Sequence, residues 1–543
     1  MRTKQLSWPL FTANAWASYE DEKFSLDLEA QRLLPRAEPV HLKPHIRLCD
    51  SDLDDQRFDH TLRTKISSAT LTSSCTTLCD LETPHMEESS LLSQQSPPWR
   101  GNQCFRSISG RLWRVCTPYR ILFSFVFLAN VIGMSFILSR ISRTARPVGN
   151  DVRAELTDVL TAVSINLTAS IAIRNEHVIN MLFRMFVTHV TPRWPLRIRR
   201  CFANIYHFGG VHSGGGVSAV AWYGIYSAVT MHDFIDSGHA SKDIANMAMT
   251  VTVWFLMCGL LVSAFPRIRA KLHNCFERMH RFCGWSILGL FWAQTLLFCI
   301  MSSGSDLGRS LMQIPTFWAL VIMSLAVAYP WVRMRQVRIR CETLSRHAIR
   351  MHVDDHRVMS PCRVVAISHS PLKETHKFAT IPEPGGRPGY SMVISRAGDW
   401  TARINNNPPK KIWIKGAPAW GVLRVATMFS PVVIVATGSG IGPCLGLFNG
   451  YPELNCRVVW QARAPNRTYG KDIVDTVLRA DKDALIVDTE VDGRKDMVRL
   501  ALRLYRESKA EAVIVISNTE GTYKVVRNLA SRGIPAYGPI WDS

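Results

Sequence analysis

A glycine-rich turn directly follows an apolar run in the last quarter of the chain. The run "PVVIVAT" ends at Thr437, and Gly438-Ser439-Gly440-Ile441-Gly442-Pro443 follows before a helix-like stretch. Glycines let the backbone approach a pyrophosphate, and the N-terminus of the next helix offers N–H groups that no helical carbonyl accepts. The third glycine comes one residue earlier than in the GxGxxG dinucleotide pattern, so an ordinary strand-to-helix connection is the alternative. We expect residues 437–443 to bind the phosphates of a nucleotide.

Three histidines lie beside long apolar stretches. His207 and His212 occur in "NIYHFGGVHSGGG", and His280 occurs in "FERMHRFCGWSILG". Ionisable side chains at membrane depth are functional candidates, and two histidines on facing helices can hold one haem. Five residues turn a helix by about 140° beyond a full turn, so His207 and His212 cannot both face His280. The alternative is that these histidines are polar groups at helix ends, and the nearby glycines fit a flat ring or close helix packing equally well.

Six mostly apolar segments form the middle of the chain. A crossing of the bilayer needs ~20 such residues. The segments lie near 119–139, 156–174, 206–229, 246–265, 281–301 and 314–333. Lys and Arg gather before the first segment and after the second, fourth and sixth, although the loop after the first is also basic. This pattern predicts a six-span membrane domain over 115–335 with both termini in the cytosol, in the plasma membrane or an internal membrane.

The chain changes character after residue 336. Short β-rich runs such as "CRVVAISHS", "YSMVISRAGDW" and "KKIWIKGAP" alternate with turn residues, which is typical of an antiparallel barrel over 336–430. Buried-looking runs "NCRVVWQAR", "DALIVDTE" and "AEAVIVISN" then alternate with helical stretches. This second pattern predicts a Rossmann-like parallel sheet over 431–543. The fold class is therefore a multi-pass helical membrane domain followed by a barrel and an α/β domain.

Composition limits the classes of partner. The formal net charge is +21, but the basic residues flank the apolar segments, so we expect a lipid bilayer as partner and no nucleic acid. The 14 cysteines form no CxxC pair, which favours a reducing compartment without a disulfide framework. Residues 1–105 are rich in Ser, Thr, Asp and Glu and are expected to form a disordered cytosolic tail. Nothing in the sequence indicates the oligomeric state.

Several motifs together resemble a known family. "RNEHVINMLF" followed by "YHFGG", the run "DWT", "ATGSGIGP" and the ending "GPIWDS" make residues 115–543 resemble the ferric reductase and NADPH oxidase superfamily. Within it the chain is most similar to fungal integral-membrane flavoproteins of the TmpA type. The resemblance implies FAD on the barrel and NAD(P)H on the parallel sheet. It also implies electron transfer to an acceptor that the sequence does not identify, with a role in redox homeostasis or developmental signalling.

The resemblance also implies residues that contact the flavin. A motif similar to HPFT appears as His376-Lys377-Phe378-Ala379-Thr380, with Phe378 near the isoalloxazine and His376 and Thr380 hydrogen-bonding around it. The segment that would touch the flavin pyrophosphate carries Asp399 and Thr401, with added positive charge from Arg396. Ordinary packing inside the barrel is the alternative for His376 and Phe378.

For the nicotinamide nucleotide, the resemblance implies Arg463 and Arg494 beside the adenosine phosphates. Relatives carry a Cys-Gly-Pro stretch opposite the nicotinamide, whereas this chain has Ser517 and Asn518 there. We expect Ser517 and the C-terminal Trp541 at the site of hydride transfer. Solvent-exposed charges and a surface tryptophan are the alternatives.

Relatives place two histidines about 13 or 14 residues apart on each haem helix, a rise of ~20 Å. Counting from His207 reaches Val220 and Ala221, and counting from His280 reaches Ala293 and Gln294. The outer ligand pair is absent, so at most one haem is expected. Because the outer histidines and the Cys-Gly-Pro stretch of the superfamily are missing, three functions stay open: a flavoprotein NAD(P)H oxidoreductase, a redox sensor with little turnover, and a ferric reductase with at most one haem.

Overall fold

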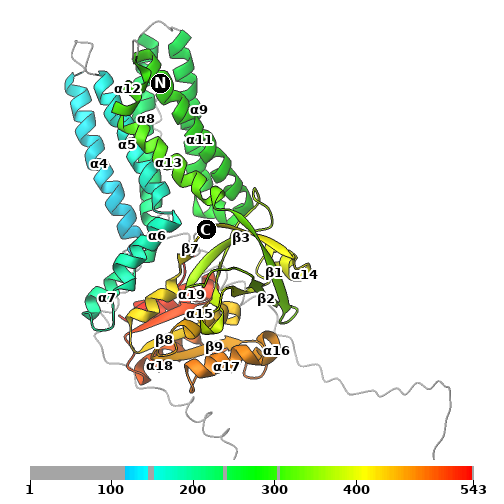
Figure 1. Cartoon of the computed structure of the whole chain (residues 1–543). Coiled ribbons are helices and arrows are strands. Elements are labelled where there is room, and N and C mark those ends of the chain that lie inside the picture. The colour runs from blue at the N-terminus through cyan, green and yellow to red at the C-terminus, as the bar shows by residue number, and fades with distance from the viewer. Residues whose placement is uncertain (1–116, 145–151, 237–240, 303–305, 541–543) are drawn as a thin grey trace, which may run out of the picture. The chain divides into compact units, whose positions relative to one another are not determined.

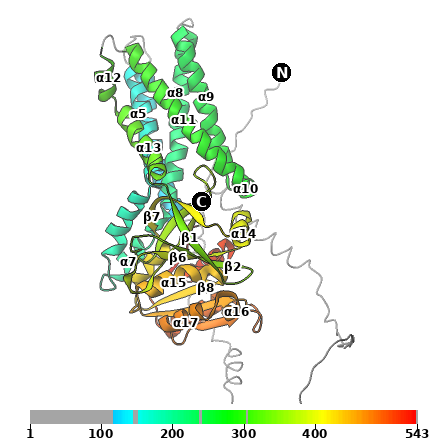
Figure 2. The same cartoon turned by 45° about the vertical axis from the view of Figure 1, so that its right-hand side comes forward.

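The computed structural model describes residues 117–144, 152–236, 241–302 and 306–540. The predicted N-terminal tail and Trp541 lie outside these residues, so the structure does not test them. All six predicted apolar segments contain a long helix, and Figures 1 and 2 show these helices running side by side. They are α4 (Pro118–Thr144), α5 (Val152–Ala172), α8 (Gly209–Asp236), α9 (Ser241–Ser263), α11 (His273–Ser302) and α13 (Pro315–Val332).

Four of these helices are long and apolar enough to cross a membrane, judged by length and composition: α4, α9, α11 and α13. A fifth candidate arises if α5 and the helix α6 (Glu176–Phe183) form one broken span, bent by 72°. The predicted third span, α8, does not meet the same criterion among the described residues. The number of spans therefore stays a prediction.

The glycines of α8 allow other helices to come close. A Cβ added to Gly210 would lie 2.3 Å from the carbonyl oxygen of Tyr119, and one added to Gly215 would lie 2.4 Å from Ser170 Oγ. Side chains at these positions would push α4 and α5 away from α8. Between the two interpretations of these glycines, the contacts favour close helix packing.

Shorter helices connect the bundle and lead into the strands. They are α6, a π-helical turn (Arg184–Thr188), α7 (Leu196–Phe202), a 3-10 turn (Ile205–His207), α10 (Pro266–Lys271) and α12 (Leu307–Gln313). The α6 residue Asn180 donates to the carbonyl of Pro418 at 3.0 Å. Its Oδ1 accepts from Arg363 at 2.8 Å and from the amide of Trp420 at 3.0 Å. These bonds hold α6 against the strands.

The predicted antiparallel barrel is present. Its strands are β1 (Arg335–Thr343), β2 (Ala348–Val353), β3 (Arg363–Ser368), β4 (His376–Ala379), β5 (Ile381–Pro382), β6 (Tyr390–Ser395) and β7 (Lys411–Trp420), in the order β4-β3-β7-β1-β2-β6-β5. The two edge strands, β4 and β5, are consecutive in the chain and are separated only by Thr380. One segment therefore pairs with β3 through its first half and with β6 through its second half, which closes the sheet on itself.

Alternating apolar residues fill the barrel. Ile349, Met351 and Val353 of β2 point inward, as do Met392 and Ile394 of β6. The short helix α14 (Asp399–Asn406) belongs to the same core through Trp400 and Ile404. This packing determines where the first turn of α14 lies.

The predicted parallel sheet follows the barrel. Its strands are β8 (Val432–Thr437), β9 (Cys456–Ala462), β10 (Leu485–Asp488), β11 (Ala512–Ile516) and β12 (Ala536–Tyr537), all parallel, in the order β10-β9-β8-β11-β12. The helices between them are α15 (Ile441–Gly450), α16 (Pro465–Tyr469), α17 (Lys471–Ala480), α18 (Met497–Glu507) and α19 (Thr519–Ala530).

Both faces of this sheet are buried, which explains its continuous apolar runs. In β8, Val432, Ile434 and Ala436 join the core with α15 and α17, while Val433 and Val435 join the core with α18 and α19. The strand order reverses between β8 and β11. In open α/β sheets, ligands bind at the carboxyl ends of the strands at such a switch point.

Candidate functional site

Two hydroxyls meet at the switch point of the parallel sheet. Thr437 ends β8, Ser517 directly follows β11, and their Oγ atoms lie 2.5 Å apart. Ser517 is buried, and the next residue, Asn518, caps α19 by accepting from the amide of Gly521 at 2.8 Å. The predicted Ser517 and Thr437 therefore come together at the edge where a ligand would bind.

The glycine turn is shaped by three different constraints. Gly438 has a φ of +52°, which favours glycine, and its carbonyl accepts from Trp460 Nε1 at 2.9 Å. A Cβ on Gly440 would lie 2.2 Å from the carbonyl oxygen of Ile516, and a Cβ on Gly442 would lie 3.0 Å from Val393 Cβ. The turn is thus pressed against β11 on one side and against the barrel on the other.

A direct hydrogen bond links the glycine turn to the barrel. Ser439 Oγ lies 2.6 Å from Ser395 Oγ, at the end of β6. Ile441 begins α15 and is fully buried, so it contributes packing and a backbone N–H rather than a side chain. The turn therefore lies at the junction of the two predicted cofactor domains.

Charged side chains surround the carboxyl ends of β9 and β10. Arg463 Nε is 3.6 Å from Glu490, Arg467 also pairs with Glu490, and both arginines are largely exposed. The hydrogen bond from Arg467 lowers the pKa of Glu490 below its usual value. Arg494 is exposed, and within the described residues its side chain forms no hydrogen bond or ion pair. Sequence reasoning missed Arg467, which follows Arg463 by four residues just beyond β9.

The predicted flavin residues His376 and Phe378 both pack against Trp400. The ring of His376 lies 4.4 Å from that of Trp400, and the ring of Phe378 stacks on Trp400 at 5.9 Å. Burial lowers the pKa of His376, so its imidazole is neutral at pH 7. Its Nε2 is buried without a hydrogen-bond partner among the described residues. Sequence reasoning did not single out Trp400, although its position in "DWT" was the available signal.

Other predicted flavin residues already make contacts within the protein. Thr380 is fully buried, and its hydroxyl donates to the carbonyl of Arg363 at 3.2 Å. Thr401 Oγ1 accepts from the amides of Ala397 and Gly398 at 2.9 Å each. Arg396 and Asp399 are exposed beside the first turn of α14. Of this group, only Arg396 and Asp399 present free side-chain surface.

Two of the three predicted haem histidines face each other. The ring centroids of His212 on α8 and His280 on α11 lie 6.1 Å apart. A metal–imidazole nitrogen bond is about 2 Å long and a ring nitrogen lies roughly 1 Å from its centroid, so two such bonds to one metal atom would span a centroid separation of about this size. His212 Nδ1 lies 2.8 Å from the carbonyl oxygen of Ser170, the kind of partner that usually orients a ligating histidine. His207 instead stacks on Tyr206 at 4.5 Å in the turn before α8.

The position of the missing outer ligand is filled. Gln294 is buried, accepts from the hydroxyl of Tyr223 at 3.0 Å and donates to Thr250 Oγ1 at 2.9 Å. Tyr223 and its neighbour Trp222 are also buried on α8. Among the described residues there is no group of three or more His, Cys, Asp or Glu that could hold a bare metal ion. A haem would need only two protein ligands, which His212 and His280 could supply.

Comparisons with known proteins point to fungal reductases. Residues 422–543 match the family model described as the C-terminal domain of adenylate-forming reductase 03009. Adenylate-forming reductase 03009 of Coprinopsis cinerea is 41% identical over 464 residues, which cover 83% of this chain and 43% of that protein. Adenylate-forming reductase 06235 of the same fungus is 41% identical over 465 residues, covering 84% and 44%. The chain thus spans less than half the length of these curated relatives.

Among solved structures, flavohemoglobin from Malassezia yamatoensis has a TM-score of 0.35 at 11% identity, covering 71% of this chain and 98% of that one. Ferredoxin-NADP+ reductase from Plasmodium falciparum has a TM-score of 0.31 at 10% identity, covering 39% and 98%. Similarities this weak define neither a shared fold nor a shared ligand. The curated relatives carry the name of reductases other than the ferric reductases and TmpA-type flavoproteins, so that narrower resemblance stays a prediction.

Proposed function

We propose that this chain is a membrane-bound flavoprotein oxidoreductase that takes electrons from NAD(P)H through FAD and passes them to an acceptor in or on the membrane. The observation that carries this proposal is the pairing of Thr437 and Ser517 at the switch point, beside a glycine turn hydrogen-bonded to the barrel. This is the edge at which α/β sheets bind nucleotides.

The residues of the sheet edge fit a nicotinamide nucleotide. The N–H groups at the start of α15 would face its pyrophosphate, and the Thr437–Ser517 hydroxyl pair would orient the carboxamide of the nicotinamide ring. Arg494 has no partner among the described residues, so it is available for a phosphate on the ribose. Arg463 and Arg467 now pair with Glu490, and on binding they would leave Glu490 and contact the same phosphate.

The barrel fits FAD through an unsatisfied group. His376 Nε2 is a buried polar atom without a partner among the described residues, and such atoms usually have one in the functional state. Arg396 and the first N–H groups of α14 would hold the flavin pyrophosphate, while Thr380 and Thr401 keep the backbone of the site in place. When bound, FAD supplies hydride acceptance and one-electron release.

His212 and His280 would hold a single haem between α8 and α11. The hydrogen bond between His212 Nδ1 and the Ser170 carbonyl leaves Nε2 of His212 free to bind iron. We expect all six long helices to lie in a bilayer, with the barrel and sheet in the cytosol, and α4, α9, α11 and α13 have the length and composition of membrane spans. His280 lies near the start of α11, and the next residue, Arg281, donates to the carbonyl of Leu372 between β3 and β4, so this end of α11 contacts the barrel.

The spectrum of the purified chain in detergent tests this proposal. A flavin absorbance that bleaches with NADPH or NADH supports the oxidoreductase, and a Soret band supports the haem. A preparation that never retains FAD would contradict the proposal. FAD retained without bleaching would instead favour the second candidate, a redox sensor. Ser517 and Asn518 support that candidate, because they stand where the ferric reductase and NADPH oxidase superfamily has a Cys-Gly-Pro stretch.

The names of the curated relatives bear on the acceptor. Both are named adenylate-forming reductases. Of the two activities in that name, reduction is the one that fits a site for a nicotinamide nucleotide at the edge of the parallel sheet. We therefore assign only electron delivery to this chain. A dedicated ferric reductase is the weakest candidate, because buried Gln294 fills the outer haem position through which electrons would cross.

A further inference from the structure

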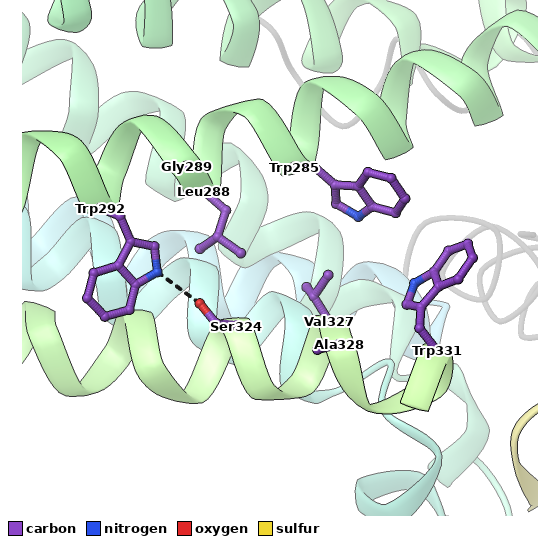
Figure 3. A pocket seen from close by; sticks show the side chains of 8 residues that line it. All are labelled: Trp285, Leu288, Gly289, Trp292, Ser324, Val327, Ala328 and Trp331. Carbon is purple, nitrogen blue, oxygen red and sulfur yellow. Dashed lines mark hydrogen bonds between the residues drawn. The ribbon is translucent and has the colours of Figure 1, made fainter. Parts of the chain in front are cut away.

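A groove rich in tryptophan runs between α11 and α13. Its volume is about 340 Å³, within the usual range of ligand pockets, roughly 300–1,000 Å³. The lining residues are Trp285, Leu288, Gly289, Trp292, Ser324, Val327, Ala328 and Trp331. Figure 3 shows Trp285 and Trp331 facing each other at one end and Trp292 bonded to Ser324 at the other.

The groove walls are almost entirely apolar. The indole N–H of Trp292 is already bonded to Ser324 Oγ at 2.9 Å, so this pair offers little to a polar ligand. A Cβ added to Gly289 would meet nothing within 4 Å, which leaves open space at the middle of the groove. A flexible hydrocarbon chain suits such a surface.

One end of the groove is positively charged. The ammonium of Lys415, on barrel strand β7, lies 3.8 Å from the centroid of the Trp331 ring. Arg281 lies one helical turn before Trp285 on α11 and donates to the carbonyl of Leu372 at 2.9 Å. Burial lowers the pKa of Lys415 to about 8, and the charge of Arg281 adds to this effect. Lys377 acts in the same direction, and only Glu176 opposes it.

We propose that the groove binds one anionic glycerophospholipid, with an acyl chain along the three tryptophans and the phosphate between Lys415 and Arg281. The positive charges of Lys415 and Arg281 complement the negative headgroup of such a lipid, and the apolar groove beside them suits its acyl chain. The site is formed by the barrel strand β7 and by helices α11 and α13, so a bound lipid would hold the barrel against these helices. This inference rests on the proposed function insofar as that places the helices in a membrane.

The test uses the full chain, purified in mild detergent and offered equal amounts of phosphatidylserine and phosphatidylcholine. Native mass spectrometry then counts the retained lipid. The expected result is one retained phosphatidylserine, preferred over phosphatidylcholine by about thirtyfold, since Lys415 and Arg281 would each contribute ~1 kcal/mol near an anionic headgroup. Gly289→Leu fills the groove and should release both lipids. The control Gly259→Leu, on α9, also meets open space and should change nothing.

Charge is tested separately. Lys415→Gln should reduce the preference for phosphatidylserine by about fivefold. Its control Lys411→Gln changes an exposed lysine of the same strand and should leave the preference intact. Equal retention of the two lipids, or retention by Gly289→Leu equal to that of the unmodified chain, overturns the proposal. Flotation with liposomes separates the two claims: a chain that floats but retains no lipid overturns only the lipid site, and one that does not float overturns membrane embedding as well.

Discussion

Arg199 of α7 and Glu511, the residue before β11, form a bidentate ion pair that joins residues 312 positions apart in the chain. Arg199 Nη1 lies 2.5 Å from Glu511 Oε2, and Arg199 Nη2 lies 2.8 Å from Glu511 Oε1. Arg199 also donates to the carbonyls of Trp194 and Met428. The segment that contains α7 and leads into α8 is thereby attached to the parallel sheet.

The first prediction concerns the stability of this attachment. Glu511→Gln leaves the buried guanidinium without its charge partner and should lower the free energy of unfolding by roughly 3 kcal/mol. The measurement is thermal unfolding of the chain in detergent. The exposed pair Arg503–Glu507 supplies the control, because Glu507→Gln should change stability by less than ~1 kcal/mol. Equal effects of the two substitutions would remove the special role of Glu511.

The second prediction is that the Arg199–Glu511 pair makes the free energy of unfolding depend on pH. Burial of Glu511 works against its charged form, but the hydrogen bonds from Arg199 and the Ser430 amide outweigh it, so the pKa of Glu511 lies below its usual value. A depressed carboxyl pKa stabilises the fold above the unfolded-state value of about 4.3, and this contribution is lost as the pH falls through the folded pKa. The unmodified chain should therefore lose more stability than Glu511→Gln does as the pH falls from about 5 to about 2. Parallel curves would contradict the prediction.

A third prediction concerns the hydroxyl pair at the switch point. Ser517→Ala removes the 2.5 Å partner of Thr437 and should lower the rate of flavin bleaching by NADPH roughly tenfold, with a smaller change in KM. Ser517→Cys keeps a side chain of similar size and should retain more of the rate. Stopped-flow absorbance measures both. If the alanine variant bleaches at the unmodified rate, Ser517 is only a packing residue.

A fourth prediction separates the two nicotinamide nucleotides. If Arg494 binds the extra phosphate of NADPH, Arg494→Ala should raise the KM for NADPH about tenfold and leave that for NADH nearly unchanged. Arg479→Ala serves as the control, because Arg479 is also exposed but bonds to Thr476 on α17. A change of the same size for both nucleotides would exclude a phosphate contact.

A fifth prediction distinguishes the histidines. His212→Ala and His280→Ala should each abolish the Soret band, whereas His207→Ala should preserve it, because His207 stacks on Tyr206 outside α8. Absorbance of the reduced protein, together with a pyridine haemochrome assay for total haem, provides the measurement. Loss of haem from the His207 variant alone would reverse the assignment.

Local patterns were enough to predict the elements. The apolar lengths near 119–139 and 314–333 correspond to α4 and α13, and the runs before Gly438 and Asn518 correspond to β8 and β11. The glycine turn is a local feature as well, since its residues follow one another in the chain. Hydrophobic period and turn residues act over a few positions, which is why one sequence suffices to place these elements.

Tertiary structure decided which side chains meet. The sequence could not choose between His207 and His212, because the choice depends on where α8 begins and on how it rotates against α11. The sequence also did not predict that the hydroxyl of Thr401 would accept a hydrogen bond from the amide of Gly398 at the start of its own helix. Nor did it predict that Trp400 would pack on His376 and Phe378. By itself the sequence determined the helices, the barrel strands and the parallel sheet, since these follow from residue periodicity. The contacts of Arg199 with Glu511 and of Thr437 with Ser517 were decided only by the folded chain, because the direction of a side chain and its distant partner are set by packing.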